Sequence, residues 1–388
     1  GHFTLMIKLM RSITTPEISL TIEDKKLGMT GFLVVESTAV GPGKGGLRMT
    51  PTVTIEEVAR LANTMTWKNS LFELPFGGAK SGIVWPPFAK ASGGKPGSEM
   101  KLKEQFVRTF ARKLKNLVPK KYIFGPDISS GQQEMKWIAD ELKRWDTATG
   151  KPSSYCQTKS GQKYCGLPHE LGSTGFGVAV AVETTAQLLN LNPKATTVGI
   201  HGFGNVGTFA AKHLLELSFT IVLLAGSKGA IYRPSGFSPA EINGVITKNQ
   251  TLADLPGKKL TSDQFWTTPV DILIPASVTN VINETNFERI QSKLIVEGGN
   301  IPMTEGIEQQ FHRRGVVVVP DVVANGGGII SSYAELQGLN PDQMFKLITE
   351  KISRATTDVM EKSIAASHYA RDVAMKLAKT NLAKQLGS

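Results

Sequence analysis

Three lysines occupy settings that are unusual for a side chain normally found in water. Lys80 lies in "PFGGAKSG", a turn expected to be close-packed, with no acidic residue beside it in the sequence. Lys44 lies in "VGPGKGGLRM", a glycine loop expected after a strand, and Lys68 continues the apolar positions Leu61 and Met65 of an expected helix. A buried cation needs a partner. The three lysines therefore suggest a shared site for an anion such as a substrate carboxylate.

A glycine-rich segment, "GFGNVG", follows an expected strand at Thr197–His201 and precedes an expected helix. Glycines at these positions let the backbone approach a pyrophosphate, which the helix N-terminus attracts. The segment predicts a dinucleotide site, with a purely structural turn as the alternative. Its candidate contacts are Gly202, Gly204, Asn205, Val206 and Gly207.

The expected second strand of this dinucleotide site ends without the acid that usually binds the adenosine ribose. Its turn reads "LLAGSKG", and no Asp or Glu occurs between Glu216 and Glu241. A hydroxyl at Ser227 and a cation at Lys228 suit a 2′-phosphate, which favours NADP. The alternative is that Lys228 is only a turn residue and that NAD is used.

The length and composition indicate a globular protein of two domains. The chain has 388 residues, and a chain of this length is too long for a single hydrophobic core. Of these residues, 40% are hydrophobic, as in a globular protein. No apolar run approaches the roughly 20 residues of a membrane span. The first residues lack the apolar segment of a signal peptide, so we expect a cytoplasmic protein.

The net charge of +11 could indicate nucleic-acid binding, but its distribution favours another interpretation. The segment 101–121 holds eight basic residues and one acid. Leu102, Phe106, Phe110 and Leu114 recur there at helical spacing. The basic residues are therefore expected to be the solvated face of an amphipathic helix, and we expect neither a nucleic-acid nor a membrane partner.

The two cysteines, Cys156 and Cys165, are too few for a disulfide framework. We expect reduced thiols in a loop, with one local disulfide as the alternative. Two thiols without a nearby pair of histidines also make a poor metal site, so no metal is expected.

The order of strand and helix patterns predicts an α/β fold. The N-terminal part mixes strands such as "TGFLVVES" with helices such as "TIEEVARLANTMTWKNSLF", where Thr54 and Glu57 form a capping-box pattern. Later, helices alternate with short apolar runs bounded by turns, which is typical of a doubly wound parallel sheet. We expect an N-terminal domain at 1–170, a Rossmann-like domain at 171–335 and C-terminal helices at 336–388.

Six segments carry a resemblance to a known family, in that family's order and from about residue 30 to 336. They read "GPGKGGLRM", "MTWKNSLFELPFGGAKSGI", "GPDISSGQQEMKWIAD", "HGFGNVG", "VEGGN" and "PDVVANGGGIISSYAE". The chain resembles the glutamate/leucine/phenylalanine/valine dehydrogenase family, and most closely its glutamate dehydrogenases. The resemblance implies reversible oxidative deamination of an L-amino acid to a 2-oxo acid and ammonia, with NADP or NAD.

The resemblance also implies roles for single residues. Lys80 matches the catalytic lysine, and Asp127 matches the acid that exchanges protons with the nitrogen. Lys68 matches the lysine that holds the substrate α-carboxylate. Lys44 and Ser332 match the residues that receive the side-chain carboxylate in glutamate enzymes. Thr174, Asn205 and Asn300 match cofactor contacts.

Larger-scale properties follow from the same resemblance. The first domain would bind substrate and oligomerise, the C-terminal helices would pack back towards it, and the protein would be a homo-oligomer, namely a hexamer.

A lysine is a useful base only when its pKa falls below the free value near 10.4. Burial and the neighbouring cations Lys44 and Lys68 are expected to lower the pKa of Lys80.

Several alternatives remain open at the level of sequence. An enzyme for leucine, phenylalanine or valine would typically have apolar residues at the positions of Lys44 and Ser332, so glutamate is preferred. A catalytically inactive regulatory member of the family is disfavoured by the presence of Lys80 and Asp127. A nucleic-acid-binding protein rests on charge alone.

Overall fold

The computed structural model describes residues 15–86, 98–247 and 250–387. The chain forms two compact units. The first contains the chain as far as Leu171, 331–344 and the residues from Ala378, and the second contains 172–330 and 345–377. The N-terminal stretch on which the signal-peptide prediction rests lies outside the described residues. Within the described ranges, no helix is long and apolar enough to cross a membrane.

The first unit is built on a mixed five-stranded sheet. Along the sheet the order is β1 (Ile18–Asp24), β2 (Met29–Val35), β4 (Gly77–Val84), β3 (Gly43–Thr50) and β5 (Tyr122–Pro126). The β1–β2 and β2–β4 pairs are antiparallel, whereas β3 pairs in parallel with both β4 and β5. The three parallel strands therefore end at one edge of the sheet.

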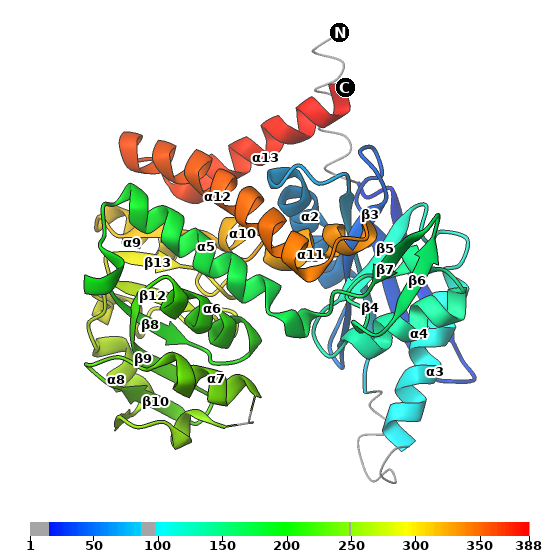
Figure 1. The fold of residues 1–388 in the computed structure, drawn as a ribbon. Coiled ribbons are helices and arrows are strands. Elements are labelled where there is room, and N and C mark those ends of the chain that lie inside the picture. Colours follow the sequence, from blue (N-terminus) through cyan, green and yellow to red (C-terminus); the bar gives the residue numbers. More distant parts are fainter. Residues whose placement is uncertain (1–14, 87–97, 248–249, 388) are drawn as a thin grey trace. The chain divides into compact units, whose positions relative to one another are not determined.

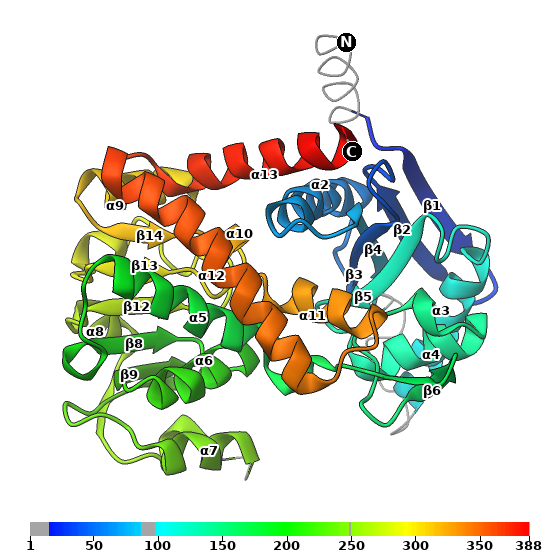
Figure 2. The same cartoon turned by 45° about the horizontal axis from the view of Figure 1, so that its top comes forward.

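Helices cover both faces of this sheet (Figure 2). Helix α2 (Ile55–Leu71) packs on one face, where Val34 and Val58 share a core. Helices α3 (Ser98–Lys113) and α4 (Gln132–Leu142) pack on the other. Phe106 and Phe110 of α3 are fully buried there, which confirms the apolar side of the predicted amphipathic helix. The helix ends at Lys113 rather than near residue 121, and its basic residues are solvated only in part, because Lys103 is half-buried in an ion pair.

The buried stripe of α2 differs from the predicted one by one position. Val58, Ala62 and Thr66 are buried, whereas Leu61 and Met65 are only half-buried. The cause is the close approach of α2 to Gly78 of β4. A Cβ on Gly78 would lie 2.1 Å from Thr66 Oγ1 and 2.3 Å from the Ala62 carbonyl oxygen. Small residues must face the strand at such a contact, so the larger apolar side chains lie at its margin.

The second unit is built on a seven-stranded sheet (Figure 1). The sheet order is β11 (Lys258–Leu260), β10 (Gly229–Tyr232), β9 (Thr220–Gly226), β8 (Thr197–His201), β12 (Ile272–Pro275), β13 (Leu294–Val296) and β14 (Val317–Val319). Within this sheet, strands β9, β8, β12, β13 and β14 pair in parallel, which confirms the predicted Rossmann-like sheet. The antiparallel edge formed by β10 and β11 was not predicted, because neither strand contains a sustained apolar run.

Helices pack against both faces of this second sheet. Leu223, Leu273 and Ile295 share a core with Phe265 of α8 (Ser262–Thr267) and with α9 (Glu305–Arg313). The adjacent strand residues point to the opposite face, as the period of a strand requires. Helices α5 (Ser173–Leu188) and α6 (Asn205–Glu216) contact the strands there. Among the residues that the structure describes, both units together also contain α7 (Pro239–Thr247), α10 (Asp321–Ala324), α11 (Gly327–Leu336), α12 (Pro341–Ala366) and α13 (Ala370–Gly387).

The two cysteines form a disulfide, so the expectation of reduced thiols was wrong. Strands β6 (Cys156–Lys159) and β7 (Gln162–Cys165) form a hairpin whose register places Cys156 opposite Cys165. Its turn residues, Ser160 and Gly161, both have positive φ, as a tight two-residue hairpin requires. This turn brings the two Cα atoms to 4.1 Å, close enough for the bond.

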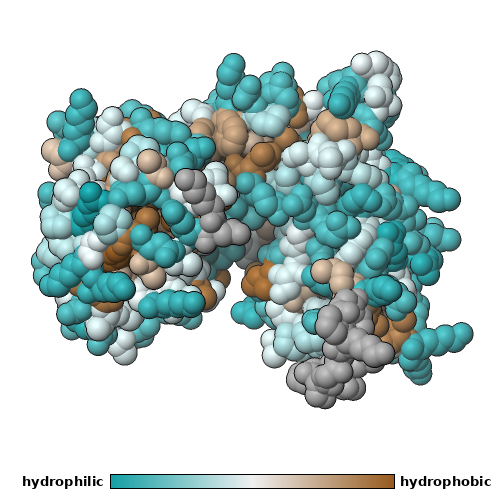
Figure 3. Space-filling view, turned by 60° about the horizontal axis from the view of Figure 1, so that its bottom comes forward, coloured by the Kyte–Doolittle hydropathy of each residue, from teal (hydrophilic) through white to brown (hydrophobic). Residues whose placement is uncertain are grey.

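The face drawn in Figure 3 is mostly hydrophilic. Large apolar side chains that are exposed, such as Met100, Val278 and Ile301, come from separate segments of the chain. Scattered exposed apolar residues are normal on a globular protein.

Candidate active site

Lys44 and Lys80 lie on strands, not in the loop and turn expected from their glycines. Lys44 is on β3 and Lys80 is on the neighbouring strand β4. The glycines serve close packing, because a Cβ on Gly45 would lie 1.6 Å from the Ala79 carbonyl oxygen. Both lysines are buried, with exposed fractions of 3% and 6%. The sheet thus places two cations inside the protein on rigid elements.

An acid that follows β5 pairs with Lys80. Asp127 Oδ1 lies 3.0 Å from Lys80 Nζ, and Asp127 Oδ2 accepts a 2.7 Å hydrogen bond from Arg48 Nε. Arg48 in turn binds Glu57 at 2.6 Å. The amide of Asp127 donates to the Ser130 hydroxyl at 3.0 Å, which fixes the turn after the strand. Lys80 therefore has an acidic partner in space, although none was visible beside it in the sequence.

Burial and charge shift the pKa values of this pair in directions suited to proton transfer. Burial lowers the pKa of Lys80, Asp127 opposes this shift, and Arg48 reinforces it. Burial alone would raise the pKa of Asp127, but the charges of Lys80 and Arg48 lower it overall. The carboxylate is thus kept ionised, while the ammonium is made easier to deprotonate.

A second polar cluster surrounds Lys44. Its Nζ donates a 3.0 Å hydrogen bond to the Phe124 carbonyl oxygen. Thr149 Oγ1 lies 3.4 Å from the same oxygen and 3.0 Å from Ser332 Oγ on α11. The strand carrying that carbonyl also approaches closely, since a Cβ on Gly125 would lie 2.6 Å from Lys44 Nζ. An ammonium and two hydroxyls thus converge, as recognition of a carboxylate requires.

Burial and neighbouring charges have opposing effects on the pKa of Lys44. Burial lowers the pKa of Lys44 to about 7; Lys80 and Lys151 lower it too, and Glu335 opposes them. A lysine with a pKa near neutrality changes its charge in the pH range where most enzymes work.

Lys68 is buried in the last turn of α2, as the sequence predicted. This helix packs against β4, the strand that carries Lys80. The first unit therefore contains all five residues predicted to act on the substrate, and these are Lys44, Lys68, Lys80, Asp127 and Ser332.

Sequence analysis missed two residues of these clusters. Arg48 lies on the same strand as Lys44, four positions further on, and residues with even spacing share one face of a strand. It would have been found if the segment had been assigned as a strand. Thr149 lies in an irregular segment, "DTATGKP", where no periodicity marks it.

The second unit holds the predicted dinucleotide loop. Gly202 has φ +100, a conformation that favours glycine, and a Cβ on Gly207 would lie 1.9 Å from the Gly202 carbonyl oxygen. A Cβ on Gly204, at the N-terminus of α6, would meet nothing within 4 Å. The backbone is therefore open at a helix N-terminus, which fits a pyrophosphate. Asn205 and Val206 form the first turn of α6.

The other predicted cofactor contacts also lie in the second unit. Ser227 and Lys228 are exposed at the turn after β9, the parallel neighbour of β8, so they lie at the same sheet edge as the glycine loop. Thr174 is in the first turn of α5. Asn300 follows β13, and its Oδ1 accepts a 2.9 Å hydrogen bond from Asn325.

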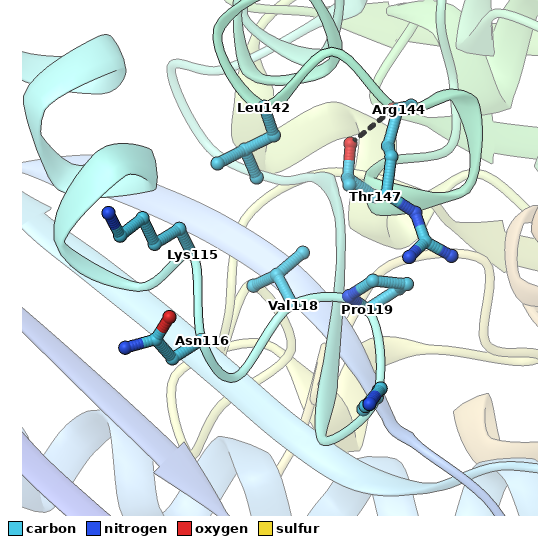
Figure 4. A pocket seen from close by; sticks show the side chains of 8 residues that line it. Lys115, Asn116, Val118, Pro119, Leu142, Arg144 and Thr147 are labelled. Atoms are coloured by element: carbon cyan, nitrogen blue, oxygen red, sulfur yellow. Dashed lines mark hydrogen bonds between the residues drawn. The ribbon is translucent and has the colours of Figure 1, made fainter.

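A separate cavity of about 310 Å³ opens in the first unit beyond the end of α3 (Figure 4). Its walls include Lys115, Lys120 and Arg144, over an apolar floor of Val118 and Leu142. Arg144 is already paired in a two-bond contact with Asp146. None of the candidate active-site residues lines this cavity, and we assign it no role.

Comparison with known proteins agrees with these features. The chain matches "Glu/Leu/Phe/Val dehydrogenase, dimerisation domain" over residues 14–144 and "Glutamate/Leucine/Phenylalanine/Valine dehydrogenase" over residues 166–386. It is 33% identical to an NADP-specific glutamate dehydrogenase of Saccharolobus shibatae, covering 96% of this chain and 90% of that protein. It is 34% identical to an NAD-specific glutamate dehydrogenase of Peptoniphilus asaccharolyticus, with coverages of 79% and 72%.

Among solved structures, the chain is similar to a hetero-hexameric glutamate dehydrogenase from Thermus thermophilus. The TM-score is 0.78 at 26% sequence identity, and the match covers 98% of this chain and 95% of that one. The similarity thus extends over both units of the chain.

Proposed function

Since the chain belongs to the glutamate/leucine/phenylalanine/valine dehydrogenase family and is an NAD(P)-dependent amino-acid dehydrogenase, we propose that its substrate is L-glutamate. The reaction would be reversible oxidative deamination to 2-oxoglutarate and ammonia. One observation carries this choice: Lys44 and Thr149 both contact the Phe124 carbonyl oxygen, and Thr149 contacts Ser332, so an ammonium and two hydroxyls form a polar cluster suited to a second carboxylate. An apolar side chain would leave a buried cation without a counter-charge there.

The proposed chemistry uses Lys80 and Asp127 as an acid–base pair, with Lys68 holding the α-carboxylate. As a neutral amine, Lys80 activates the water that attacks the imine carbon. Asp127, 3.0 Å away and ionised, accepts from Lys80 the proton taken from that water and delivers it to the departing ammonia. The lowered pKa values of both groups support these roles. Burial of the site limits the access of bulk water to the imine.

A bound nicotinamide dinucleotide would supply the hydride acceptor for the α-carbon. The residues that would hold its pyrophosphate are in the loop from Gly202 to Gly207, with Thr174 and Asn300 as further contacts. We infer a preference for NADP from the hydroxyl of Ser227 and the cation of Lys228, which suit a 2′-phosphate. The relatives include both NADP-specific and NAD-specific enzymes, so the preference depends on these two residues.

We further infer that the protein assembles as a closed homo-hexamer. Support comes from the match of its N-terminal part to a dimerisation domain and from the hexameric state named for the Thermus enzyme. That enzyme is a hetero-hexamer, which contains more than one kind of chain. A homo-hexamer requires that this chain, purified by itself, forms the assembly. Light scattering at micromolar concentration checks this, and a monomer would contradict it.

The proposed function is tested by following the absorbance of the reduced cofactor. The assay combines 2-oxoglutarate, ammonium and NADPH or NADH, and the reverse direction uses L-glutamate with the oxidised cofactors. Matched reactions use L-leucine, L-phenylalanine and L-valine. We expect activity with glutamate to exceed that with the others. Faster oxidation of leucine or phenylalanine would refute the substrate proposal.

A further inference from the structure

A fully buried ion pair lies in the first unit behind the Lys44 cluster. Lys151 Nζ lies 2.6 Å from Glu335 Oε1, and both side chains have an exposed fraction of 0%. The ammonium also lies 4.0 Å from the centre of the Trp145 ring and donates to the Ala148 carbonyl. Burying two charges is costly in desolvation, and such a pair contributes little to stability on average. Its presence therefore calls for a functional reason.

The second oxygen of Glu335 holds the backbone of the same wall. Glu335 Oε2 accepts hydrogen bonds from the amides of Gly150 at 2.7 Å and Leu167 at 2.8 Å. These amides flank the disulfide-closed hairpin of β6 and β7. One carboxylate on α11 therefore fixes both ends of the segment that carries this hairpin.

The residues fixed by Glu335 adjoin the pocket proposed for the side-chain carboxylate. Ser332 precedes Glu335 by three positions on α11, so both side chains lie on one side of the helix. Thr149 directly precedes Gly150. Helix α11 therefore contacts three consecutive residues of this segment: Ser332 contacts Thr149 at 3.0 Å, and Glu335 contacts Gly150 and Lys151. Any movement of Glu335 would disturb both hydroxyls.

The same pair acts on Lys44 through its charges. The charged groups that influence Lys44 are Glu335 from α11, Lys151 from the segment after Ala148, and Lys80 from β4. Glu335 raises the pKa of Lys44, whereas Lys151 and Lys80 lower it. The two members of the buried pair therefore have opposite effects on the charge of Lys44.

We propose that Glu335 and Lys151 are positioning residues for substrate selection: they hold Ser332 against Thr149 and set the charge of Lys44. Neither needs to touch the substrate. The inference rests on the proposed function, because it assumes that Lys44 and Ser332 receive the side-chain carboxylate of glutamate. It adds that selectivity for glutamate depends on a charge pair behind the pocket.

The test measures kcat/KM for L-glutamate and for L-norleucine as a function of pH. The ratio of the two values cancels the contributions of Lys68, Lys80 and Asp127, which act on both substrates. Glu335→Gln should raise KM for glutamate by about 10-fold to 100-fold with kcat little changed. It should also lower the pH at which the ratio has fallen to half of its low-pH value, the midpoint, whereas Lys151→Met should raise this midpoint.

A matched control and a second variant keep the test decisive. Lys121 and Glu17 form an exposed ion pair in the same unit, so Lys121→Met should leave the ratio and its midpoint unchanged. If Glu335→Gln does not fold, as judged by circular dichroism, the double change Lys151→Met with Glu335→Gln avoids an unpaired buried charge. Its midpoint should also fall, because Glu335 influences Lys44 more than Lys151 does.

The outcomes separate this inference from the proposed function. If both single changes reduce activity on glutamate and norleucine equally and leave the midpoint in place, the pair is merely structural and the inference is wrong. If the unmodified protein prefers norleucine to glutamate at every pH, the proposed function fails instead. Midpoints that move in opposite directions for the two changes support the inference, since loss of packing alone would not produce them.

Discussion

Lys80 on β4 and Asp127 after β5 form an ion pair of 3.0 Å, although strand β3 lies between their strands in the sheet. The intervening strand carries Arg48, which binds the other oxygen of the same carboxylate at 2.7 Å. The carboxylate is therefore held from two sides and aimed at the amine. This arrangement gives the proposed acid–base pair a fixed geometry, which proton transfer requires.

Lys80→Ala and Asp127→Asn should each abolish most of the turnover without preventing folding. Positioned acid–base groups usually contribute on the order of 10² to 10⁴ in rate. In Lys80→Ala, the Asp127 carboxylate keeps Arg48 as its partner, so no buried charge is left alone. We expect kcat to fall by that factor, while quenching of reduced-cofactor fluorescence shows unchanged cofactor binding.

Lys121→Ala provides the control for these two variants. Lys121 also pairs with a carboxylate, that of Glu17 at 2.6 Å, but both side chains are exposed, to 45% and 37%. Its loss should leave kcat within a factor of about two, since exposed pairs contribute little. Near-normal turnover in either of the first two variants would show that the assigned roles are wrong.

Much of the architecture could be predicted because the local patterns and the tertiary structure agree. Short apolar runs bounded by turns became the parallel strands, and Thr197–His201 is a strand with the predicted bounds. The Thr54 hydroxyl accepts the predicted N-cap hydrogen bond from Glu57 at 3.2 Å. The Glu57 side chain instead binds Arg48, so the reciprocal bond of the capping box gave way to a contact with the site.

The remaining features depend on contacts that a linear pattern does not contain. Glycines around Lys44 and Lys80 were interpreted as loops, but they are strand residues pressed against other backbone. Thr149 faces Ser332 only because α11 packs on its segment. The disulfide depends on hairpin register, which follows from a two-residue turn rather than from the cysteine count. Each error concerns a place where tertiary packing overrides local propensity.

Gly78→Ala should destabilise the first unit strongly. The added Cβ would lie 2.3 Å from a backbone oxygen and 2.4 Å from a backbone nitrogen of α2, neither of which can rotate away. Overpacking usually costs about 1 to 3 kcal/mol, and we expect the upper end of that range or more. Gly306→Ala is the control, because its nearest contact would be at 3.9 Å. Urea unfolding should show a clear loss for the first change and little for the second.

Lys228→Asp should shift cofactor use from NADPH towards NADH. The change removes a cation suited to a 2′-phosphate and supplies an acid suited to a ribose hydroxyl. We expect KM for NADPH to rise by at least about tenfold, and KM for NADH to fall. Lys194→Asp alters an exposed lysine before β8 and should change neither value. Equal use of both cofactors by the unmodified protein would contradict the proposed preference.

Selectivity for glutamate over norleucine should fall as the pH rises through neutrality. Burial, with Lys80 and Lys151, lowers the pKa of Lys44 to about 7 against the opposing effect of Glu335. Lys44 is charged below that pKa, where it attracts a carboxylate, and is neutral above it. The ratio of kcat/KM values should therefore be high at low pH and decline by up to about tenfold per unit above the midpoint. In Lys44→Met the ratio should be low and independent of pH.

The double change Lys44→Leu with Ser332→Val should convert the specificity of the enzyme. Glutamate brings a second carboxylate, which loses hydration on entering the pocket and needs charge-assisted bonds of about 1.5 to 3 kcal/mol each in return. The double change removes those bonds and lines the pocket with apolar atoms, so glutamate activity should fall sharply and activity on leucine or norleucine should rise. Either change alone should mostly lose glutamate, because one polar group would remain without its partner. The test measures kcat/KM for glutamate and for norleucine in the two single variants and in the double variant. Retention of glutamate preference by the double variant would place side-chain recognition elsewhere in the protein.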